Sequence, residues 1–360
     1  MDNLTRKIEN FDLWWKGNKT GLPLMRIVAH RSEGLELDPI YLPVSPEDRF
    51  LNEEKAAGRY QHYVDTRMFF ADSYPCMPLD FGAGSMALYL GCSPIFEWPT
   101  VWFEECIPTA KDLKKLAFDS ENFWWKKHLK AVKNSVSLSK GKFLIDIPDI
   151  IENLDILASL RGSQNLLIDL LDSPECIKQA LEILDGLYFE YYDPLYNLVK
   201  TPEGASSYTS FLVMGSGKTA KVQCDLSPML SPKCFDEFVL PYLARQCTRL
   251  DNSIYHLDGS NAMLHLDSIL SISDLTALQF TPEPGQPDCT NAIWYDMYDK
   301  TAAAGKSLWA TVSDGKLNDW IASGDRFINR YGSKATYLLF PEMDIASAEK
   351  LMTHAEKFWH

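Results

Sequence analysis

No apolar run in this 360-residue sequence reaches the roughly 18 residues that a membrane-spanning helix requires. Basic residues are scarce relative to acidic ones, and the formal net charge is −14. A nucleic-acid partner is therefore not expected, because contacts with phosphates need a basic surface. Residues 1–10 are charged and lack the apolar core of a signal peptide. We therefore expect a cytoplasmic protein without a membrane partner.

Cysteine pairs and the usual cofactor motifs are missing as well. The eight cysteines are scattered without a C-x-x-C pair, a pattern typical of buried thiols in a reducing compartment. No G-x-G-x-x-G follows a predicted strand, so a dinucleotide site has no support. H-E-x-x-H and G-x-S-x-G are absent too. The missing motifs disfavour dinucleotide-dependent enzymes, H-E-x-x-H metalloproteases and G-x-S-x-G serine hydrolases.

The segment Gly215-Ser216-Gly217-Lys218-Thr219 is similar to a phosphate-binding loop only in its letters. Leu212 replaces the glycine that the full motif needs five residues before Gly217, and the segment precedes a strand instead of following one. We predict a flexible lid over the mouth of the fold here, because two glycines permit hinge movement.

The sequence does contain an alternation of short apolar runs and helical patterns, which is clearest in its second half. Five strand–helix units recur from Lys221 to the C-terminus. Their strands are continuously apolar, as is typical of a parallel sheet buried on both faces. The predicted strands of these units are 221–225, 254–257, 275–280, 308–312 and 337–340.

The first half of the chain is less regular. Residues 1–20 predict a polar helical extension, and residues 23–30 predict a first strand. Further helices are expected at 109–133, 150–160, 164–171 and 174–198, with a strand at 143–147. Together the units predict an α/β fold, a (β/α)8 TIM barrel that forms one domain over residues 1–360 with an N-terminal helical extension. An open doubly wound sheet is the alternative.

In a barrel of this kind, functional groups lie where the strands end and the following loops begin. His256-Leu257-Asp258-Gly259 ends one predicted strand. Residues i and i+2 of a strand face the same side, so His256 and Asp258 are expected to point into one cavity. Such a pair serves as metal ligands or as an acid–base pair. The alternative is a hydrogen-bonded histidine beside an aspartate that caps the next helix.

Polar groups at the two adjacent strand ends extend this candidate site. Cys224 and Asp225 end the preceding strand, and Asp225 must find a partner or face the cavity, because burying an unpaired charge is costly. Glu283 follows the next strand between two prolines that fix the shape of its loop. Both Cys224 and Glu283 have structural alternatives, as an inert buried thiol and as an ordinary solvated loop residue.

The segment Val222 to Leu243, V-Q-C-D-L-S-P-M-L-S-P-K-C-F-D-E-F-V-L-P-Y-L, resembles the uroporphyrinogen decarboxylase superfamily. There an acidic strand end leads to S-P, a phenylalanine and a P-Y-L helix. His256-Leu257-Asp258-Gly259 occupies the place of that superfamily's H-x-x-G turn. The resemblance covers most of the chain, is strongest from about 143 to 285, and implies a (β/α)8 barrel with its site at the carboxyl-terminal rim.

One chemistry of that superfamily is the removal of carboxylates from a tetrapyrrole without a cofactor. Its M-R-Q-A-G-R-Y segment holds substrate carboxylates, and the matching residues here are Met25-Arg26-Ile27-Val28-Ala29-His30-Arg31. Ala57-Gly58-Arg59-Tyr60 repeats some of the letters inside a predicted helix, which we interpret as chance. The late G-H-G segment is replaced by Pro341-Glu342-Met343. The resemblance therefore disfavours decarboxylation of uroporphyrinogen.

The second chemistry is methyl transfer between a corrinoid protein and a thiol or another acceptor, using zinc. Its enzymes carry H-x-C-G and a late-strand cysteine as ligands, whereas Asp258 replaces the first cysteine here and strand 308–312 has none. The usual soft site is therefore missing, and two alternatives remain: a zinc site with harder ligands, drawn from His256, Asp258, Glu283 and Cys224, or no metal at all. No D-x-H-x-x-G motif occurs, so a corrinoid would be carried by a separate partner protein.

The sequence thus favours a uroporphyrinogen-decarboxylase-like methyltransferase component, closer to the corrinoid-dependent branch than to true decarboxylases. The expected catalytic residues are Asp225, His256 and Asp258. The expected substrate-binding residues are Arg26, Arg31, Asp146, Tyr208 and Phe211. Two alternatives are a cofactor-free decarboxylase or lyase acting on a smaller carboxylic acid, and a non-catalytic binding protein. The methyl donor, the acceptor and a homo-oligomeric state stay open.

Overall fold

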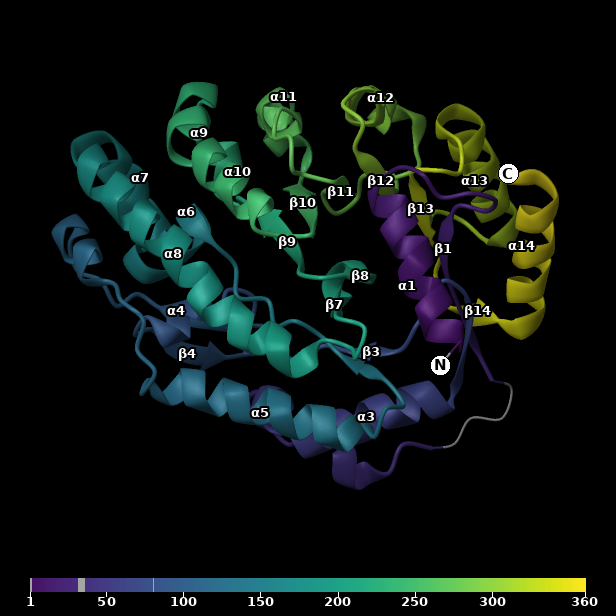
Figure 1. Ribbon diagram of the computed structural model, residues 1–360, viewed down its shortest axis with the longest axis horizontal. Coiled ribbons are helices and arrows are strands. Elements are labelled where there is room, and N and C mark those ends of the chain that lie inside the picture. Colours follow the sequence, from purple (N-terminus) through teal and green to yellow (C-terminus); the bar gives the residue numbers. More distant parts are fainter. Residues whose placement is uncertain (1, 32–35, 80) are drawn as a thin grey trace.

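A curved, mainly parallel sheet is the centre of the computed structural model, which describes residues 2–31, 36–79 and 81–360 (Figure 1). The parallel strands are, in spatial order, β14 (Met343–Asp344), β1 (Leu24–His30), β13 (Thr336–Leu339), β12 (Ser307–Thr311), β11 (Ala277–Thr281), β10 (Asn252–Asp258) and β9 (Thr219–Gln223). The antiparallel strand β2 (Arg67–Ala71) pairs with β1 and completes this eight-stranded sheet.

The remaining strands form three small pairs. They are β3 (Cys76–Met77) with β6 (Leu144–Ile145), β4 (Ser93–Phe96) with β5 (Val101–Glu104), and β7 (Ala205–Tyr208) with β8 (Val213–Ser216). Single hydrogen bonds link some of these pairs, such as the one from the Ile147 amide to the Ser207 carbonyl at 3.0 Å. The α/β class and the parallel sheet agree with the sequence prediction and are compatible with a barrel-like fold. Among the described residues, however, the paired strands form no continuous closed barrel.

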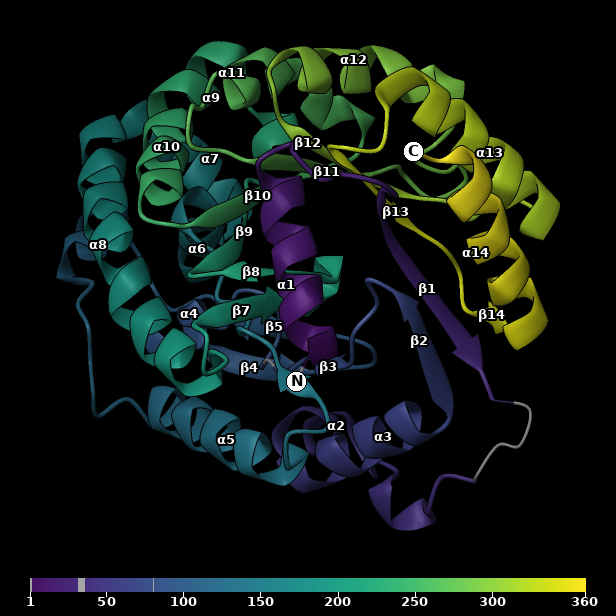
Figure 2. The ribbon, with the colours of Figure 1, turned by 45° about the vertical axis from the view of Figure 1, so that its right-hand side comes forward.

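Helices cover the outside of the strands (Figure 2). In the second half they are α9 (Pro232–Phe238), α10 (Leu240–Thr248), α11 (Leu266–Leu270), α12 (Tyr295–Ala303), α13 (Leu317–Tyr331) and α14 (Ile345–Phe358). In the first half they are α2 (Pro46–Leu51), α3 (Glu53–Asp65), α4 (Met86–Tyr89), α5 (Phe123–Ser139), α6 (Asn153–Arg161), α7 (Ser163–Asp172) and α8 (Pro174–Val199). The five predicted strand–helix units from β9 onward are all present. No helix in the described ranges has both the length and the apolarity that a membrane span requires.

The helix predicted at 109–133 is correct only from residue 123 onward. A 3-10 helix at Ala110–Lys115 comes first, and α5 begins only at Phe123. Asn122 caps α5 by accepting a hydrogen bond from the Trp125 amide at 3.0 Å. Asparagine favours this position because its side chain replaces a missing helical partner, and the preceding Asp119 and Ser120 favour a turn.

Helix α1 (Asp2–Trp15) lies against the amino-terminal ends of the parallel strands. Its residues Phe11 and Trp14 are completely buried, and they pack in one cluster with Leu24, Ile254 and Tyr337 of the sheet. The Trp14 indole donates a hydrogen bond to the carbonyl of Ala335, just before β13, at 3.0 Å. The predicted extension is therefore helical but not polar throughout, because one face of it belongs to the core.

The glycines of the predicted lid lie at the same end of the strands as α1. A Cβ atom on Gly215 would lie 2.4 Å from Asn252 Nδ2 and 2.8 Å from Trp15 Nε1. A Cβ atom on Gly217 would lie 2.1 Å from a carboxylate oxygen of Asp251. Both glycines thus permit close packing, and the prediction of a lid over the opposite, carboxyl-terminal mouth is wrong.

We expect Trp14→Ala to lower the free energy of unfolding by about 3–5 kcal/mol, because it removes a completely buried indole and its hydrogen bond. Leu13→Ala is the matched control, since Leu13 is 38% exposed and its loss should cost under about 1 kcal/mol. Urea unfolding followed by circular dichroism measures both. Equal destabilisation by the two substitutions would contradict the role of α1 in the core.

Candidate metal and proton-transfer site

Three side chains with metal-binding atoms meet at the carboxyl ends of β9 and β10. Asp225 follows β9, and His256 and Asp258 are alternate residues at the end of β10. One candidate ligand atom from each residue lies within 4.8 Å of the other two. Parallel pairing of the strands, with Gln223 opposite His256, brings the two strand ends to the same level. The structure therefore brings together the three residues that the sequence predicts as catalytic.

Cys224 and Glu283, which were also predicted as metal ligands, lie outside this group. Cys224 is buried among apolar side chains, because its side chain alternates with that of Asp225, and burial raises the pKa of its thiol. Glu283 accepts hydrogen bonds from the amide and the hydroxyl of Ser260, both at 2.7 Å. Glu283 thus connects the loop after β11 to the turn after β10. These positions support the structural alternatives for both residues.

The ring of His256 is oriented by Gln279 on the neighbouring strand β11. His256 Nδ1 forms a short hydrogen bond with Gln279 Oε1, and Gln279 Nε2 donates to Thr281 Oγ1 at 2.8 Å. The amide oxygen of Gln279 faces the histidine and can only accept, so in this arrangement Nδ1 of His256 is the nitrogen that donates. The lone pair on Nε2 is then left for a metal ion or a proton.

A buried ion pair lies two residues before Gln223 on β9, nearer the amino-terminal end of the strand than His256. Lys221 of β9 is 6% exposed, and its Nζ lies 2.9 Å from Asp149 Oδ2. Burial alone lowers the pKa of Lys221, but the neighbouring acids, with Asp149 first among them, outweigh burial and raise it. Lys221 is therefore a cation. Burial and, next, the charge of Lys221 lower the pKa of His256, so its imidazole is neutral near pH 7.

Acidic residues at the start of α6 hold the segment that contains Asp225. Asp155 accepts hydrogen bonds from the amides of Asp225, at 2.8 Å, and Leu226, at 3.2 Å. The side-chain amide of Gln223 bridges the carboxylates of Asp155, at 2.9 Å, and Asp225, at 2.8 Å. Glu152 accepts from the Gln223 backbone amide at 2.6 Å. These bonds fix Asp225 relative to β9.

Burial raises the pKa of two of these acids. It raises the pKa of Glu152, a fully enclosed side chain, to about 8. Burial and then the charge of Asp155 raise the pKa of Asp225 to about 7, although solvent reaches part of its side chain. The site thus combines a neutral histidine with carboxyl groups that titrate near neutral pH, an arrangement suited to moving protons.

The turn between β7 and β8 lies beside His256. The ring centroid of Phe211 is 5.2 Å from that of His256, and the Tyr208 ring lies 5.9 Å from Lys221 Nζ. Asp146 accepts a hydrogen bond from the Thr209 amide at 2.8 Å and thereby anchors the turn. Of these predicted substrate-binding residues, Phe211 and Tyr208 lie against the site, whereas Asp146 supports them.

Arg26 and Arg31 have other partners. The guanidinium of Arg26 lies 3.4 Å from Glu342, which also pairs with Arg67 at 2.8 Å and accepts from Tyr63 at 2.8 Å. Arg31 is exposed and donates to the Arg67 carbonyl at 3.2 Å. The charge of Arg26 is thus offset within the protein, and its predicted contact with a substrate stays a prediction.

Four residues of the site escaped the sequence analysis, namely Asp149, Glu152, Asp155 and Lys221. The signal was present, because residues 146–155 carry an acid at every third position directly after a short strand. Lys221 is a charge inside an apolar strand, and such a charge needs a buried partner. The two signals together predict an ion pair at this edge of the sheet.

Comparison with known proteins defines the fold and leaves the family open. No family model matches the chain, and no curated protein matches it. Among solved structures, the chain is similar to a methyltransferase from Methanosarcina mazei, with a TM-score of 0.63 and 13% identity over 98% of this chain and 99% of that one. At this identity the similarity shows a shared fold over the whole length.

The pH dependence of stability tests the burial of Glu152. The folded state keeps this proton up to about pH 8, whereas the unfolded state loses it near pH 4.5. The free energy of unfolding should therefore fall as pH rises through this window, by about 1.4 kcal/mol per pH unit at most. Glu152→Gln should lack this contribution, because an amide does not titrate.

Urea unfolding across that window measures the effect in both proteins. Glu190→Gln, which changes an exposed glutamate of α8, is the control and should follow the wild type. The same pH dependence in Glu152→Gln as in the wild type would show that Glu152 is already ionised in the folded protein.

Proposed function

We propose that this chain is a methyltransferase component in which Asp225, His256 and Asp258 hold a divalent metal ion, with zinc the best fit. The observation that carries the proposal is the approach of the three ligand atoms to within 4.8 Å of one another. Three protein ligands and one open position are typical of catalytic zinc sites. The shared fold with a methyltransferase supports the class of reaction.

The donor set fits a cation. Two carboxylates held this close repel each other, and a positive ion between them would remove that repulsion. Imidazole and carboxylate donors suit zinc, whereas Cys224 faces the core and supplies no thiolate. A bound zinc ion supplies Lewis acidity, which lowers the pKa of a thiol or polarises the atom that carries a methyl group.

The residues around this group position the ligands. The hydrogen bond from His256 Nδ1 to Gln279 orients the imidazole and leaves its Nε2 available as a ligand. The side-chain amide of Gln223 holds the carboxylate of Asp225. Such supporting contacts typically change metal affinity about 10–100-fold. Phe211 contacts the imidazole with its ring tilted by 45°.

We propose further that the methyl group is exchanged with a corrinoid carried by a separate protein. The site lies at the carboxyl ends of the strands, away from α1, and the side chains of Asp225 and Asp258 are exposed there. A partner protein would therefore approach at this mouth. The chain itself has no D-x-H-x-x-G motif for holding a corrinoid.

A cofactor-free lyase or decarboxylase that acts on a small carboxylic acid is the second candidate. The observation that favours it is the buried cation Lys221 directly below His256. In such an enzyme the substrate carboxylate would share Lys221 with Asp149, because this cation lies nearer to the site than Arg26, which is paired with Glu342. Asp225 or His256 would then supply the proton.

Elemental analysis of protein purified without added metal tests the metal site. We expect about one zinc ion per chain in the wild type and none in His256→Ala or Asp258→Ala. Cys224→Ser is the matched control and should retain zinc, because Cys224 lies outside the group. Gln279→Leu should weaken zinc binding roughly 10–100-fold, since it releases the His256 ring. Absence of zinc from the wild type after incubation with excess metal would contradict the site.

Methyl transfer itself is measured with methylcobalamin as a free corrinoid and a small thiol as the acceptor. We expect the zinc-loaded wild type to remove the methyl group at least roughly 100-fold faster than His256→Ala. The absorbance change of the corrinoid follows the reaction. Release of carbon dioxide from a small carboxylic acid, without zinc or corrinoid, would support the lyase instead.

A further inference from the structure

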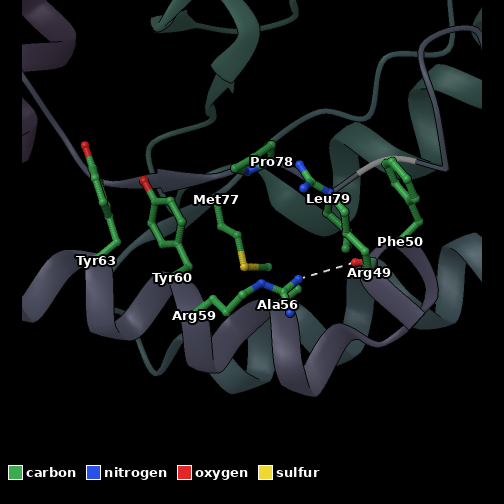
Figure 3. Close-up of a pocket in the computed structure, with 9 residues that line it drawn as sticks. All are labelled: Arg49, Phe50, Ala56, Arg59, Tyr60, Tyr63, Met77, Pro78 and Leu79. Atoms are coloured by element: carbon green, nitrogen blue, oxygen red, sulfur yellow. Dashed lines mark hydrogen bonds between the residues drawn. The ribbon is translucent and has the colours of Figure 1, made fainter. Parts of the chain in front are cut away.

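A separate cavity of about 420 Å³ lies between helices α2 and α3 on one side and strand β3 on the other (Figure 3). None of its lining residues belongs to the group formed by Asp225, His256 and Asp258. The side chains that characterise this cavity are Arg49, Arg59, Phe50, Tyr60, Tyr63 and Met77. It therefore combines two positive charges with aromatic and apolar walls.

The two arginines have no carboxylate partner within the described parts of the chain. Arg59 donates to the backbone carbonyls of Tyr41, at 2.9 Å, and Arg49, at 3.3 Å. The Arg49 guanidinium lies over the ring of Trp98, 5.6 Å from its centroid. Asp48, the residue before Arg49, is already paired with Lys55 at 2.7 Å. Hydrogen bonds hold the Arg59 guanidinium, whereas the Arg49 side chain is exposed and lies against aromatic rings, so these contacts leave both charges without neutralisation.

Holding these two like charges together is unfavourable. Burial and, next, the charge of Arg49 lower the pKa of Arg59. Arginine nevertheless stays protonated in proteins, so both charges persist. An anion placed between the two guanidinium groups would offset the repulsion and would accept hydrogen bonds from both.

The other walls suit an apolar body. The hydroxyl of Tyr60 accepts a hydrogen bond from the Cys76 amide at 2.7 Å, and that of Tyr63 donates to Glu342 at 2.8 Å. The Tyr63 proton is thus used, whereas the Tyr60 hydroxyl accepts and keeps its own proton, and the Tyr60 ring stands beside Met77 between α3 and the strand (Figure 3). Apolar walls with a few fixed polar groups are typical of small-molecule sites of this size.

We propose that this cavity binds a small organic anion, with its carboxylate, sulfonate or phosphate group between Arg49 and Arg59 and its apolar or aromatic body against Tyr60 and Met77. Guanidinium groups match such anions because two parallel N–H donors meet two oxygens. The proposal goes beyond the proposed methyl transfer and does not depend on it, because it rests on different residues.

Isothermal titration of the full-length protein with naphthalene-2-carboxylate tests the proposal, with 2-naphthylmethanol as the neutral probe of similar shape. We expect the carboxylate to bind roughly tenfold or more tightly than the alcohol. Arg59→Gln should weaken binding of the carboxylate by a similar factor and leave the alcohol unchanged. Ala56→Phe keeps both arginines but fills the cavity, so it should abolish binding of both probes.

Arg326→Gln is the matched control, because Arg326 lies on α13 and donates to Ser323 of its own helix. It should bind both probes as the wild type does, and circular dichroism checks that every variant is folded. Equal affinity of the wild type for the two probes would overturn the proposal. So would wild-type affinity in both Arg59→Gln and Ala56→Phe, no binding at the solubility limit of the carboxylate, or equally tight binding of inorganic phosphate alone.

Discussion

The ion pair between Lys221 and Asp149 is the constraint on which the rest of the site depends. A lysine on the inward face of β9 cannot be buried without a partner, because an unpaired charge in the interior costs several kcal/mol. The carboxylate that meets it comes from the loop between β6 and α6. That loop, once held, also places Glu152 and Asp155 against the end of β9, where they fix Gln223 and the segment after it. One buried charge thus determines how two distant parts of the chain are joined.

The two ends of the parallel strands are built from different chemistry. At the amino-terminal ends, α1 buries indole and phenyl rings, and Gly215 and Gly217 allow close packing there. At the carboxyl ends, acids, amides and an imidazole are linked by hydrogen bonds and partly reached by water. The packing that stabilises the fold and the polar groups of the site therefore lie at opposite ends of the strands. The stable end offsets the cost of burying acids such as Glu152, whose pKa is raised, at the polar end.

The sequence predicted what depends on local pattern. The strand–helix units from β9 onward follow from apolar runs and helix starts, and the pairing of His256 with Asp258 follows from the two-residue period of a strand. Contacts between distant residues were not predictable in the same way. Lys221 and Asp149 are 72 positions apart, and Arg26 and Glu342 are 316 apart, so no local pattern links them. Glu283 was misjudged because its partner, Ser260, belongs to a neighbouring loop. Helix α1 was predicted to be polar because charged residues surround Phe11 and Trp14 in the sequence, although these two side chains lie three residues apart on one buried face.

Helix α1 also bears on how molecules reach the site. Its aromatic side chains pack against the amino-terminal ends of the strands, whereas Asp225 and Asp258 are exposed at the opposite, carboxyl-terminal ends. A large molecule seated over those exposed side chains would cover whatever small molecule had bound there before it. It would then have to dissociate before a product could escape, so binding and release would follow a fixed order.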